Sequence, residues 1–231
     1  MSHFVYLVCI IRIFVYTIVM IITYHGVDFF KVTFGDTTIA VNPISKDSKL
    51  KSTKFGSDIT LVSLNSPEHN GTDITSRGDK ESFLINGPGE YEVSGVFIKG
   101  FLSKSMYGGS EHINTIYTVA LEGINLCFLG AIKDAQISAE TKEAIDGIDI
   151  LFVPIGGDGV LKAADAYKLA VKLEPKLIIP MHFGSVGEPT ALKHFLKEGG
   201  EEGVKPIDKL TIKKKDLEGK EGDTVVLESI S

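Results

Sequence analysis

The chain has few cysteines, and this scarcity excludes several kinds of protein. Only Cys9 and Cys127 occur among its 231 residues, so a disulfide framework and a cysteine-based zinc site are both excluded. Cys127 lies in the apolar run at residues 124–129, which is typical of a buried free thiol. A chain without a disulfide framework suits a reducing compartment, and we therefore expect a cytoplasmic protein.

Long runs of positive charge are also lacking. The longest run of basic residues is Lys213, Lys214 and Lys215, which Asp216 follows at once, and the formal net charge is −6. A chain with no basic stripe gives no electrostatic footprint for a phosphate backbone, so we expect no nucleic-acid partner. The partner that remains is a small molecule or another protein, and the sequence does not identify it.

The N-terminal segment is strongly apolar but lacks the features of a secretory signal. Residues 4–22 are almost all apolar, interrupted by Arg12, with no basic start and no small-residue cleavage site. A central arginine costs about 2.5–3.5 kcal/mol in a membrane helix, which this segment would outweigh, so a membrane anchor is an alternative. A strand expected at residues 21–24 would leave no linker after such an anchor. We therefore expect residues 1–19 to be an extension, such as a misassigned start, ahead of one domain at residues 20–231.

Strand patterns are followed by helix patterns, twice along the chain. The alternating residues 27–34 and 37–41 form a predicted hairpin around Gly35 and Asp36, and a second hairpin is predicted around Glu122 and Gly123. Amphipathic spacing and caps predict helices, whereas short apolar runs predict buried strands. The predicted helices span residues 138–147, 162–173 and 189–199, and the predicted buried strands span residues 59–64, 149–153 and 176–180.

Three phrases and one loop carry a family resemblance. The loop follows the predicted strand at residues 59–64 and reads Leu-Asn-Ser-Pro-Glu-His at residues 64–69. The phrases are Gly-Pro-Gly-Glu-Tyr at residues 87–91, Phe-Val-Pro-Ile-Gly-Gly at residues 152–157 and Pro-Lys-Leu-Ile-Ile-Pro-Met-His at residues 175–182. Together they resemble the metallo-β-lactamase superfamily, in the branch of metal-dependent hydrolases similar to ascorbate-6-phosphate lactonase. The resemblance implies an α/β fold, a four-layer αββα sandwich.

The resemblance also implies that metal ligands have been lost. The family loop reads His-x-His-x-Asp-His and binds metals that activate a water for hydrolysis. Its two leading histidines fall on Leu64 and Ser66, its aspartate on Glu68 and its last histidine on His69. Because leucine and serine cannot replace an imidazole on zinc, the site expected from the resemblance is degenerate.

The remaining ligand positions lie further along the chain. The bridging aspartate that follows Leu-Gly falls on Ala131, and the final histidine falls on His182. The acid of the family's Asp-Pro falls on Asn42, before Pro43. The middle histidine has no clear counterpart, although His112 lies in the corresponding region. Glu68, His69 and His182 are then the surviving candidate ligands.

Two functions follow from this inventory. The first, which we prefer at this stage, is a non-catalytic scaffold for a ligand or partner, without a cofactor. The alternative is a hydrolase of a lactone, ester or phosphoester with one zinc ion held by Glu68, His69 and His182, since two histidines and a carboxylate suffice for a catalytic zinc. Glutamate reaches one methylene further than aspartate, which counts against this ligand set.

Other polar positions give weaker signals. Gly156 and Gly157 precede a helix and resemble a phosphate-binding turn, but the lysine of a P-loop is lacking, so a tight turn is preferred. Glu90 lies on a predicted strand, where a structural role is preferred over acid–base chemistry. We expect His25 to pack at the end of its strand and His194 to lie on a surface. No Ser-His-Asp or Cys-His arrangement stands out in the sequence.

Overall fold

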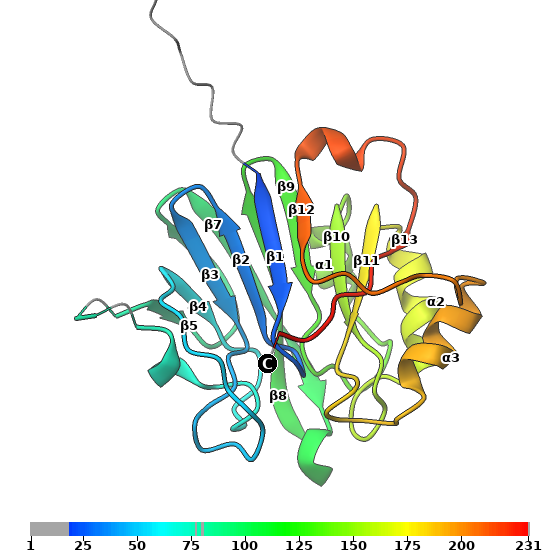
Figure 1. Cartoon of the computed structure of the whole chain (residues 1–231), viewed down its shortest axis with the longest axis horizontal. Helices are drawn as coiled ribbons and strands as arrows, with labels where there is room; N and C mark the ends of the chain where they lie inside the picture. Colours follow the sequence, from blue (N-terminus) through cyan, green and yellow to red (C-terminus); the bar gives the residue numbers. More distant parts are fainter. Residues whose placement is uncertain (1–18, 77, 80, 231) are drawn as a thin grey trace, which may run out of the picture.

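Two β-sheets packed face to face form the centre of the molecule (Figure 1). The computed structural model describes residues 19–76, 78–79 and 81–230. The six-stranded sheet contains, in spatial order, β12 (Leu210–Ile212), β1 (Met20–Tyr24), β2 (Phe30–Phe34), β3 (Thr37–Val41), β4 (Ile59–Leu61) and β5 (Phe83–Ile85). The seven-stranded sheet contains β13 (Asp223–Thr224), β11 (Leu177–Met181), β10 (Ile150–Pro154), β9 (Ile124–Phe128), β8 (His112–Leu121), β7 (Val96–Ser105) and β6 (Gly89–Val93).

The core lies between the two sheets. Phe30 of the first sheet contacts Phe152 of the second, with ring centroids 4.8 Å apart, and Phe152 stacks on Phe128 at 4.0 Å. Strand β10 is buried along its whole length, because its other face packs under the helices. Strands buried on both faces read as continuous apolar runs, which is the pattern of residues 150–154.

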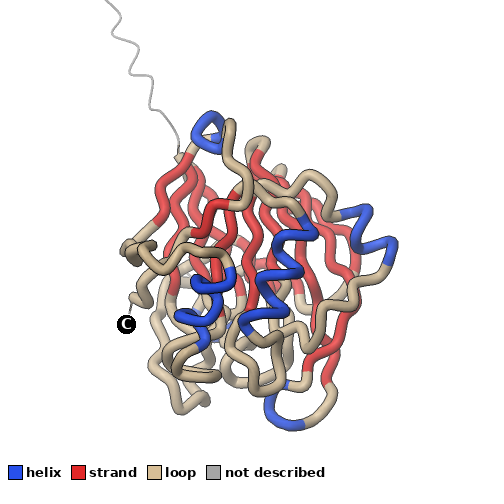
Figure 2. The backbone as a smooth tube through the Cα atoms, turned by 90° about the vertical axis from the view of Figure 1, so that its right-hand side faces the viewer, coloured by secondary structure: helices blue, strands red, loops and turns tan. Residues whose placement is uncertain are grey.

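The three α-helices cover the outer face of the seven-stranded sheet (Figure 2). They are α1 (Ala139–Ala144), α2 (Ala163–Leu173) and α3 (Ala191–Glu198). Helix α1 begins after Ser138, whose hydroxyl accepts a hydrogen bond from the Thr141 amide at 3.0 Å, a standard N-cap. The apolar face of α3 buries Phe195 against the same layer.

The outer face of the six-stranded sheet is covered differently. Loops and the 3-10 helix η1 (Thr72–Ile74) pack there, in an apolar cluster that includes Phe29, Ile44 and Ile74. The α/β sandwich expected from the sequence is confirmed, but among the described residues no α-helix covers this face.

One predicted strand begins later than expected. Residues 27–34 were predicted as a single strand, but β2 starts at Phe30. A turn precedes it, in which the amide of His25 donates to the Phe29 carbonyl at 2.8 Å and the amide of Phe29 donates to the Gly26 carbonyl at 2.9 Å. Asp28 therefore lies in a loop at the end of the sandwich rather than in the sheet.

The N-terminal predictions are only partly within reach of the structure. Residues 1–18 lie outside the described residues, and Met20 is the first residue of β1. Within residues 19–230 as described, no helix is long and apolar enough to cross a membrane. Among residues 19–230 as described, two further 3-10 helices are η2 (Tyr107–Gly109) and η3 (Lys214–Leu217).

Candidate metal site

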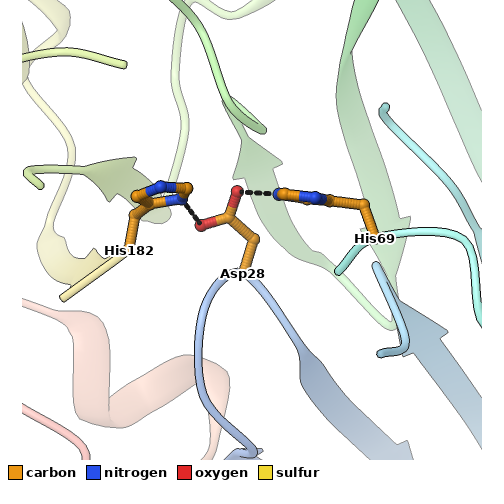
Figure 3. Close-up of side chains that lie close together, drawn as sticks. All are labelled: Asp28, His69 and His182. Carbon is orange, nitrogen blue, oxygen red and sulfur yellow. Dashed lines mark hydrogen bonds and ion pairs between the residues drawn. The ribbon is translucent and has the colours of Figure 1, made fainter. Parts of the chain in front are cut away.

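Three buried side chains from three distant segments meet at one end of the sandwich (Figure 3). Asp28 lies in the turn between β1 and β2, His69 in the loop after β4, and His182 immediately after β11. Nε2 of His69 lies 2.9 Å from Oδ2 of Asp28, and Nδ1 of His182 lies 3.1 Å from Oδ1. One ligand atom of each residue lies within 4.8 Å of the others. Within the described part of the chain, this is the one such group of three.

Several non-glycine residues in or near this group have a positive φ, which is rare for residues with a side chain. Val27, Asn42 and His182 have φ values of 53°, 50° and 61°. Positive φ in a β-branched residue such as Val27 is a marked departure, and such strain gathers at functional sites. The Val27 carbonyl accepts hydrogen bonds from the His182 amide at 2.6 Å and from the Tyr24 hydroxyl at 2.9 Å. These bonds fix the turn that presents Asp28 to His182.

The pKa of the fully buried Asp28 carboxyl is held below its ordinary value by its two histidine neighbours. Burial raises the pKa of this carboxyl. The charges and hydrogen bonds of His182 and His69 lower the pKa by more than burial raises it, so the net pKa lies well below the ordinary carboxyl range. A buried carboxylate needs a positive partner, because its charge is otherwise very costly. In this site the partners of the carboxylate are the imidazoles of His69 and His182. The same three side chains could instead hold a metal cation.

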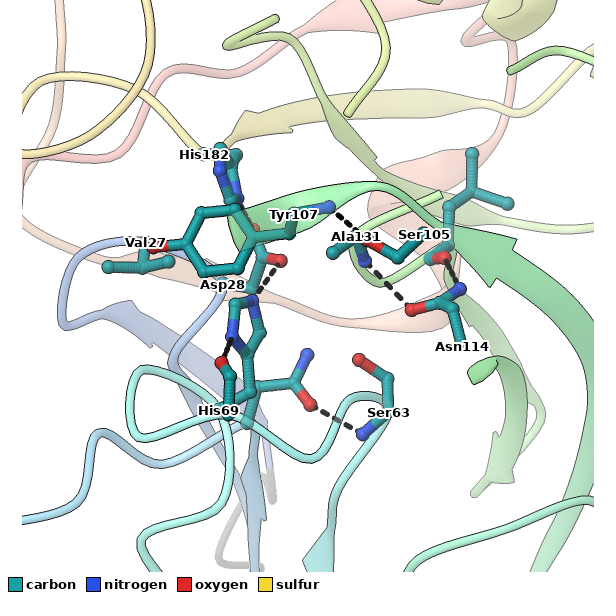
Figure 4. Close-up of polar contacts among 12 residues, drawn as sticks. Val27, Asp28, Ser63, His69, Ser105, Tyr107, Asn114, Ala131 and His182 are labelled. Atoms are coloured by element: carbon teal, nitrogen blue, oxygen red, sulfur yellow. Dashed lines mark hydrogen bonds and ion pairs between the residues drawn. The ribbon is translucent and has the colours of Figure 1, made fainter. Parts of the chain in front are cut away.

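The second nitrogen of each imidazole has a different environment. Nδ1 of His69 lies 2.8 Å from the Ser66 hydroxyl. Figure 4 shows the His69 ring with Asp28 on one side. The His69 and Asn70 amides both donate to the Ser66 carbonyl, at 2.9 and 3.0 Å, so a tight turn fixes the serine relative to the imidazole. Nε2 of His182, in contrast, is buried without a hydrogen-bond partner.

Tyr107 forms the outer wall of the site. Its ring lies edge-on to both imidazoles, with centroids 5.2 Å from His69 and 5.1 Å from His182. The side chain is partly exposed, whereas the three polar groups behind it are fully buried. Burial, followed by the charges of Glu68, Asp28 and Asp158, raises the Tyr107 pKa to about 12. The phenol is therefore neutral.

The structure brings together two of the three candidate ligands expected from the sequence. His69 and His182 converge, but Glu68 points away, partly exposed, and accepts a hydrogen bond from the Ser48 hydroxyl at 3.0 Å. Neighbouring residues of a tight turn project in different directions, so Glu68 and His69 do not face one point. Asp28 replaces Glu68 as the carboxylate of the group.

The positions of the expected lost ligands are occupied by other contacts. Leu64 and Ala131 are buried and pack with Val160 and the Tyr107 ring in a small apolar cluster. Ser66 contacts His69, as described above. Asn42 accepts a hydrogen bond from the Ser63 amide at 2.8 Å, which holds the start of the loop that carries His69.

The two candidate glycines belong to the packing around the site. A Cβ on Gly156 would lie 2.1 Å from the His182 carbonyl oxygen, so only glycine allows the chain to pass behind that histidine. The Gly157 amide donates to the Leu161 carbonyl at 2.9 Å, which makes a tight turn. Glu90 is exposed on β6 and pairs with Lys99 at 2.9 Å.

The other histidines that the structure describes lie outside the group. His25 packs against Phe29, with ring centroids 4.9 Å apart. His112 is exposed and lies 2.7 Å from the Ser110 hydroxyl, and His194 is exposed on α3.

Sequence reasoning missed Asp28 and Tyr107. One sequence signal pointed to Asp28. This acid interrupts an apolar segment, between Val27 and Phe29, and follows Gly26 by two residues.

Comparison with known proteins points in one direction. Residues 21–182 match the protein family described as the beta-lactamase superfamily domain. A protein of Listeria innocua named UPF0173 metal-dependent hydrolase is 27% identical over 200 residues, covering 72% of this chain and 86% of that protein. One of the same name from Carboxydothermus hydrogenoformans is 41% identical over 56 residues, 24% of this chain and 23% of that protein.

Solved structures agree with this match. A Thermotoga maritima protein named for Zn-dependent hydrolases of the metallo-β-lactamase superfamily has a TM-score of 0.71 and 26% identity, covering 90% of this chain and 98% of that chain. A Parabacteroides distasonis protein named for metal-dependent hydrolases has a TM-score of 0.63 at 17% identity, covering 92% and 94%, and supports the fold alone. The expectation that no cofactor binds gains no support from these relatives or from the candidate metal site.

Proposed function

Because the chain belongs to the β-lactamase superfamily domain family, we propose that it binds one divalent ion of the zinc class through Asp28, His69 and His182 and hydrolyses an ester or lactone. The observation that carries this proposal is the convergence of a carboxylate and two imidazoles in one buried group. Relatives of the chain are named metal-dependent hydrolases, which agrees with this donor set.

The residues fit such an ion. Two histidines and one carboxylate are a ligand set of catalytic zinc sites. The donor atoms of a tetrahedral site with bonds of about 2.0–2.1 Å lie roughly 3.3 Å apart. One ligand atom of each residue already lies within 4.8 Å of the others, although the two imidazoles face different oxygens of Asp28, so these side chains would draw closer together around an ion. Nε2 of His182, which is buried without a hydrogen-bond partner, is the alternative ligand atom of that ring, since each residue offers one ligand atom to an ion.

Each residue has a defined task in this proposal. When bound, an ion of this class acts as a Lewis acid on the substrate and activates water. Asp28 supplies the negative charge that offsets a cation in a buried site. Ser66 orients the His69 ring through Nδ1, in the way that outer partners of ligating histidines do. The neutral Tyr107 ring shields the group from bulk water.

The surroundings favour one ion and a substrate without a phosphate. Leu64, Ala131 and Val160 are apolar where a second ion would need ligands. Glu68, Asp28 and Asp158 all act on Tyr107 as negative charges. With Asp28 offset by the ion, Glu68 and Asp158 remain near Tyr107 and would weaken the binding of a dianionic phosphoester relative to that of a neutral ester or lactone.

Metal analysis of purified variants tests the proposal. We expect one equivalent of zinc or cobalt per chain, lost in His182→Ala and in Asp28→Asn. His112→Ala and His194→Ala are matched controls, because both histidines are exposed and outside the group. Absence of metal from the chain after zinc is supplied would refute the proposal, as would binding that both site variants retain.

A specific observation favours a second candidate, the non-catalytic scaffold. Both Asp28 oxygens already accept imidazole hydrogen bonds, and all three side chains are fully buried. Such a group could serve only to join the two sheets. Under this alternative the folded chain takes up no metal, whereas thermal unfolding of Asp28→Asn and His182→Ala still reports large destabilisation.

A further inference from the structure

A hydroxyl, an imidazole and a carboxylate lie in line within the site. The Ser66 hydroxyl is 2.8 Å from Nδ1 of His69, and Nε2 of the same ring is 2.9 Å from Oδ2 of Asp28. Each distance is that of a good hydrogen bond. Serine hydrolases are recognised by such an arrangement, in which a hydroxyl nucleophile contacts a base and an acid orients that base.

We propose that the metal-free chain uses Ser66 as a nucleophile toward acyl esters, with His69 as the base and Asp28 as the residue that orients it. This inference goes beyond the proposed function, since it requires no metal. It also concerns a residue that stands at the position of an expected lost ligand.

The relay requires one particular tautomer of His69. In this tautomer Nε2 carries the proton that faces Asp28, Nδ1 is an acceptor, and the Ser66 hydroxyl donates to it. The contacts of 2.8 Å at Nδ1 and 2.9 Å at Nε2 are both compatible with this assignment.

The reaction balances without another reagent. The Ser66 oxygen forms a bond to the acyl carbon while its proton passes to Nδ1 of His69. The ester bond to the alkoxide breaks, and the imidazolium returns the proton to the leaving alcohol. Water then attacks the acyl-serine, gives a proton to Nδ1 and releases the acid, while Ser66 regains its proton. The net change is ester plus water to acid plus alcohol.

The local structure supports this role. Ser66 is partly exposed, while His69 and Asp28 are fully buried, so the nucleophile is the member of the chain that a substrate can reach. The turn closed by the His69 amide on the Ser66 carbonyl fixes the spacing between them. The ring nitrogens are used in the opposite order to that of trypsin-type triads, but both are equally able to pass a proton.

The two uses of His69 exclude each other. Its Nε2 faces Asp28 in the metal-free relay and would face the ion in the metal site. A bound ion should therefore protect Ser66 from reaction, and zinc should act as an inhibitor of this second activity.

Covalent labelling tests the inference on the full chain. The chelator-treated protein is incubated with a fluorophosphonate probe, and adducts are located by peptide mass spectrometry. We expect one adduct at Ser66, absent in Ser66→Ala and slowed on the order of a hundredfold or more in Asp28→Asn. The probe loses fluoride as the phosphorus–oxygen bond forms, so the mass gain identifies the reaction.

The chain contains its own control. Ser110 lies 2.7 Å from Nε2 of His112 but is exposed and has no buried carboxylate behind the ring. We expect no selective labelling there. Lack of labelling at Ser66, equal labelling at Ser110, or indifference to Asp28→Asn would each overturn the inference.

Failure here is distinguishable from failure of the proposed metal site. His182→Ala removes a metal ligand but none of the Ser66, His69 and Asp28 side chains, so it should abolish metal binding while labelling at Ser66 persists at a reduced rate, because Asp28 loses one of its two imidazole partners. Ser66→Ala should abolish labelling and retain metal with lowered affinity, because Ser66 contacts the proposed ligand His69. Circular dichroism of both variants confirms folding. Loss of labelling in folded His182→Ala would refute the independence of the relay.

Discussion

Two adjacent positions at one end of the sandwich have opposite chemistry. One holds Asp28, His69 and His182, all buried and joined by hydrogen bonds. The other holds Leu64, Ala131 and Val160, all buried and apolar. Tyr107 contacts both positions. The difference teaches that the chain has kept one polar centre and packed its neighbour with hydrocarbon.

The comparison also separates two sources of stability. A buried ion pair adds little to the free energy of unfolding when it is compared with well-packed apolar residues in its place. Removal of only one partner, however, lowers the free energy of unfolding strongly, because the other charge stays buried and unpaired. A buried apolar group contributes through burial and close packing. The two positions should therefore respond differently when one side chain is removed.

The largest effect is expected from Asp28→Ala. Two buried imidazoles would lose their only carboxylate, and breaking a buried pair in this way costs roughly 3–5 kcal/mol. Urea unfolding at neutral pH measures the change. Glu111→Ala is a matched control, because Glu111 also accepts two cationic partners, Lys104 at 2.7 Å and Lys133 at 2.9 Å, but on the surface. A loss of similar size in both variants would contradict the importance of burial.

The next largest effect is expected from Leu64→Ala in the apolar position. Removing a buried leucine side chain leaves a cavity and costs about 2–4 kcal/mol, while metal content should stay unchanged. Unfolding and metal analysis of the same sample check both parts. Leu64→Met keeps most of the volume and should cost less than about 1.5 kcal/mol. Parallel loss of metal in Leu64→Ala would mean that the two positions are one site.

The sequence predicted more of the fold than of the site, for a physical reason. Apolar periodicity and caps are local, so β10, α2 and α3 were placed to within about two residues, within the usual boundary error. His69 and His182 were found because the resemblance assigned them. Asp28 was missed because the alternation of residues 27–34 placed it inside a strand, and the turn that frees it depends on bonds to Tyr24 and His182.

The Glu68 expectation has a related explanation. Spacing alone gives Glu68 and His69 equal standing, since the two are adjacent in the sequence. The direction of each side chain depends on a turn closed by the Ser66 carbonyl and on the Ser48 hydroxyl, which lies 20 residues earlier. The pairings of Asp28 with His69 and His182 span 41 and 154 residues, and no local pattern encodes contacts of that kind.

A smaller effect is expected from Tyr107, which joins the two positions. Tyr107→Ala removes the wall over His69 and His182, so metal loaded into the chain should leave several-fold faster when a chelator is added. Tyr107→Phe keeps the ring and is the control. Stopped-flow mixing with a coloured chelator measures the rate. Equal rates for wild type and Tyr107→Ala would mean that the route to the site does not pass this ring.

The smallest effect is expected from His25. This histidine is buried like those of the site, but it has no carboxylate partner among the described residues. Burial first, and then the charge of Lys31, lower the His25 pKa from 6.5 to about 4. The unfolded chain therefore binds more protons than the folded chain between these values, so stability is present above pH 6.5 and is lost as pH falls toward 4. We expect a loss of about 1–2 kcal/mol, less than the full pKa shift would give, because nearby solvent screens the charged ring. His25→Phe keeps the stack on Phe29 and Phe55 but cannot titrate, so urea unfolding between pH 6.5 and 4 should show a shallower decline than in the wild type. An identical decline in both proteins would assign the acid sensitivity to other groups.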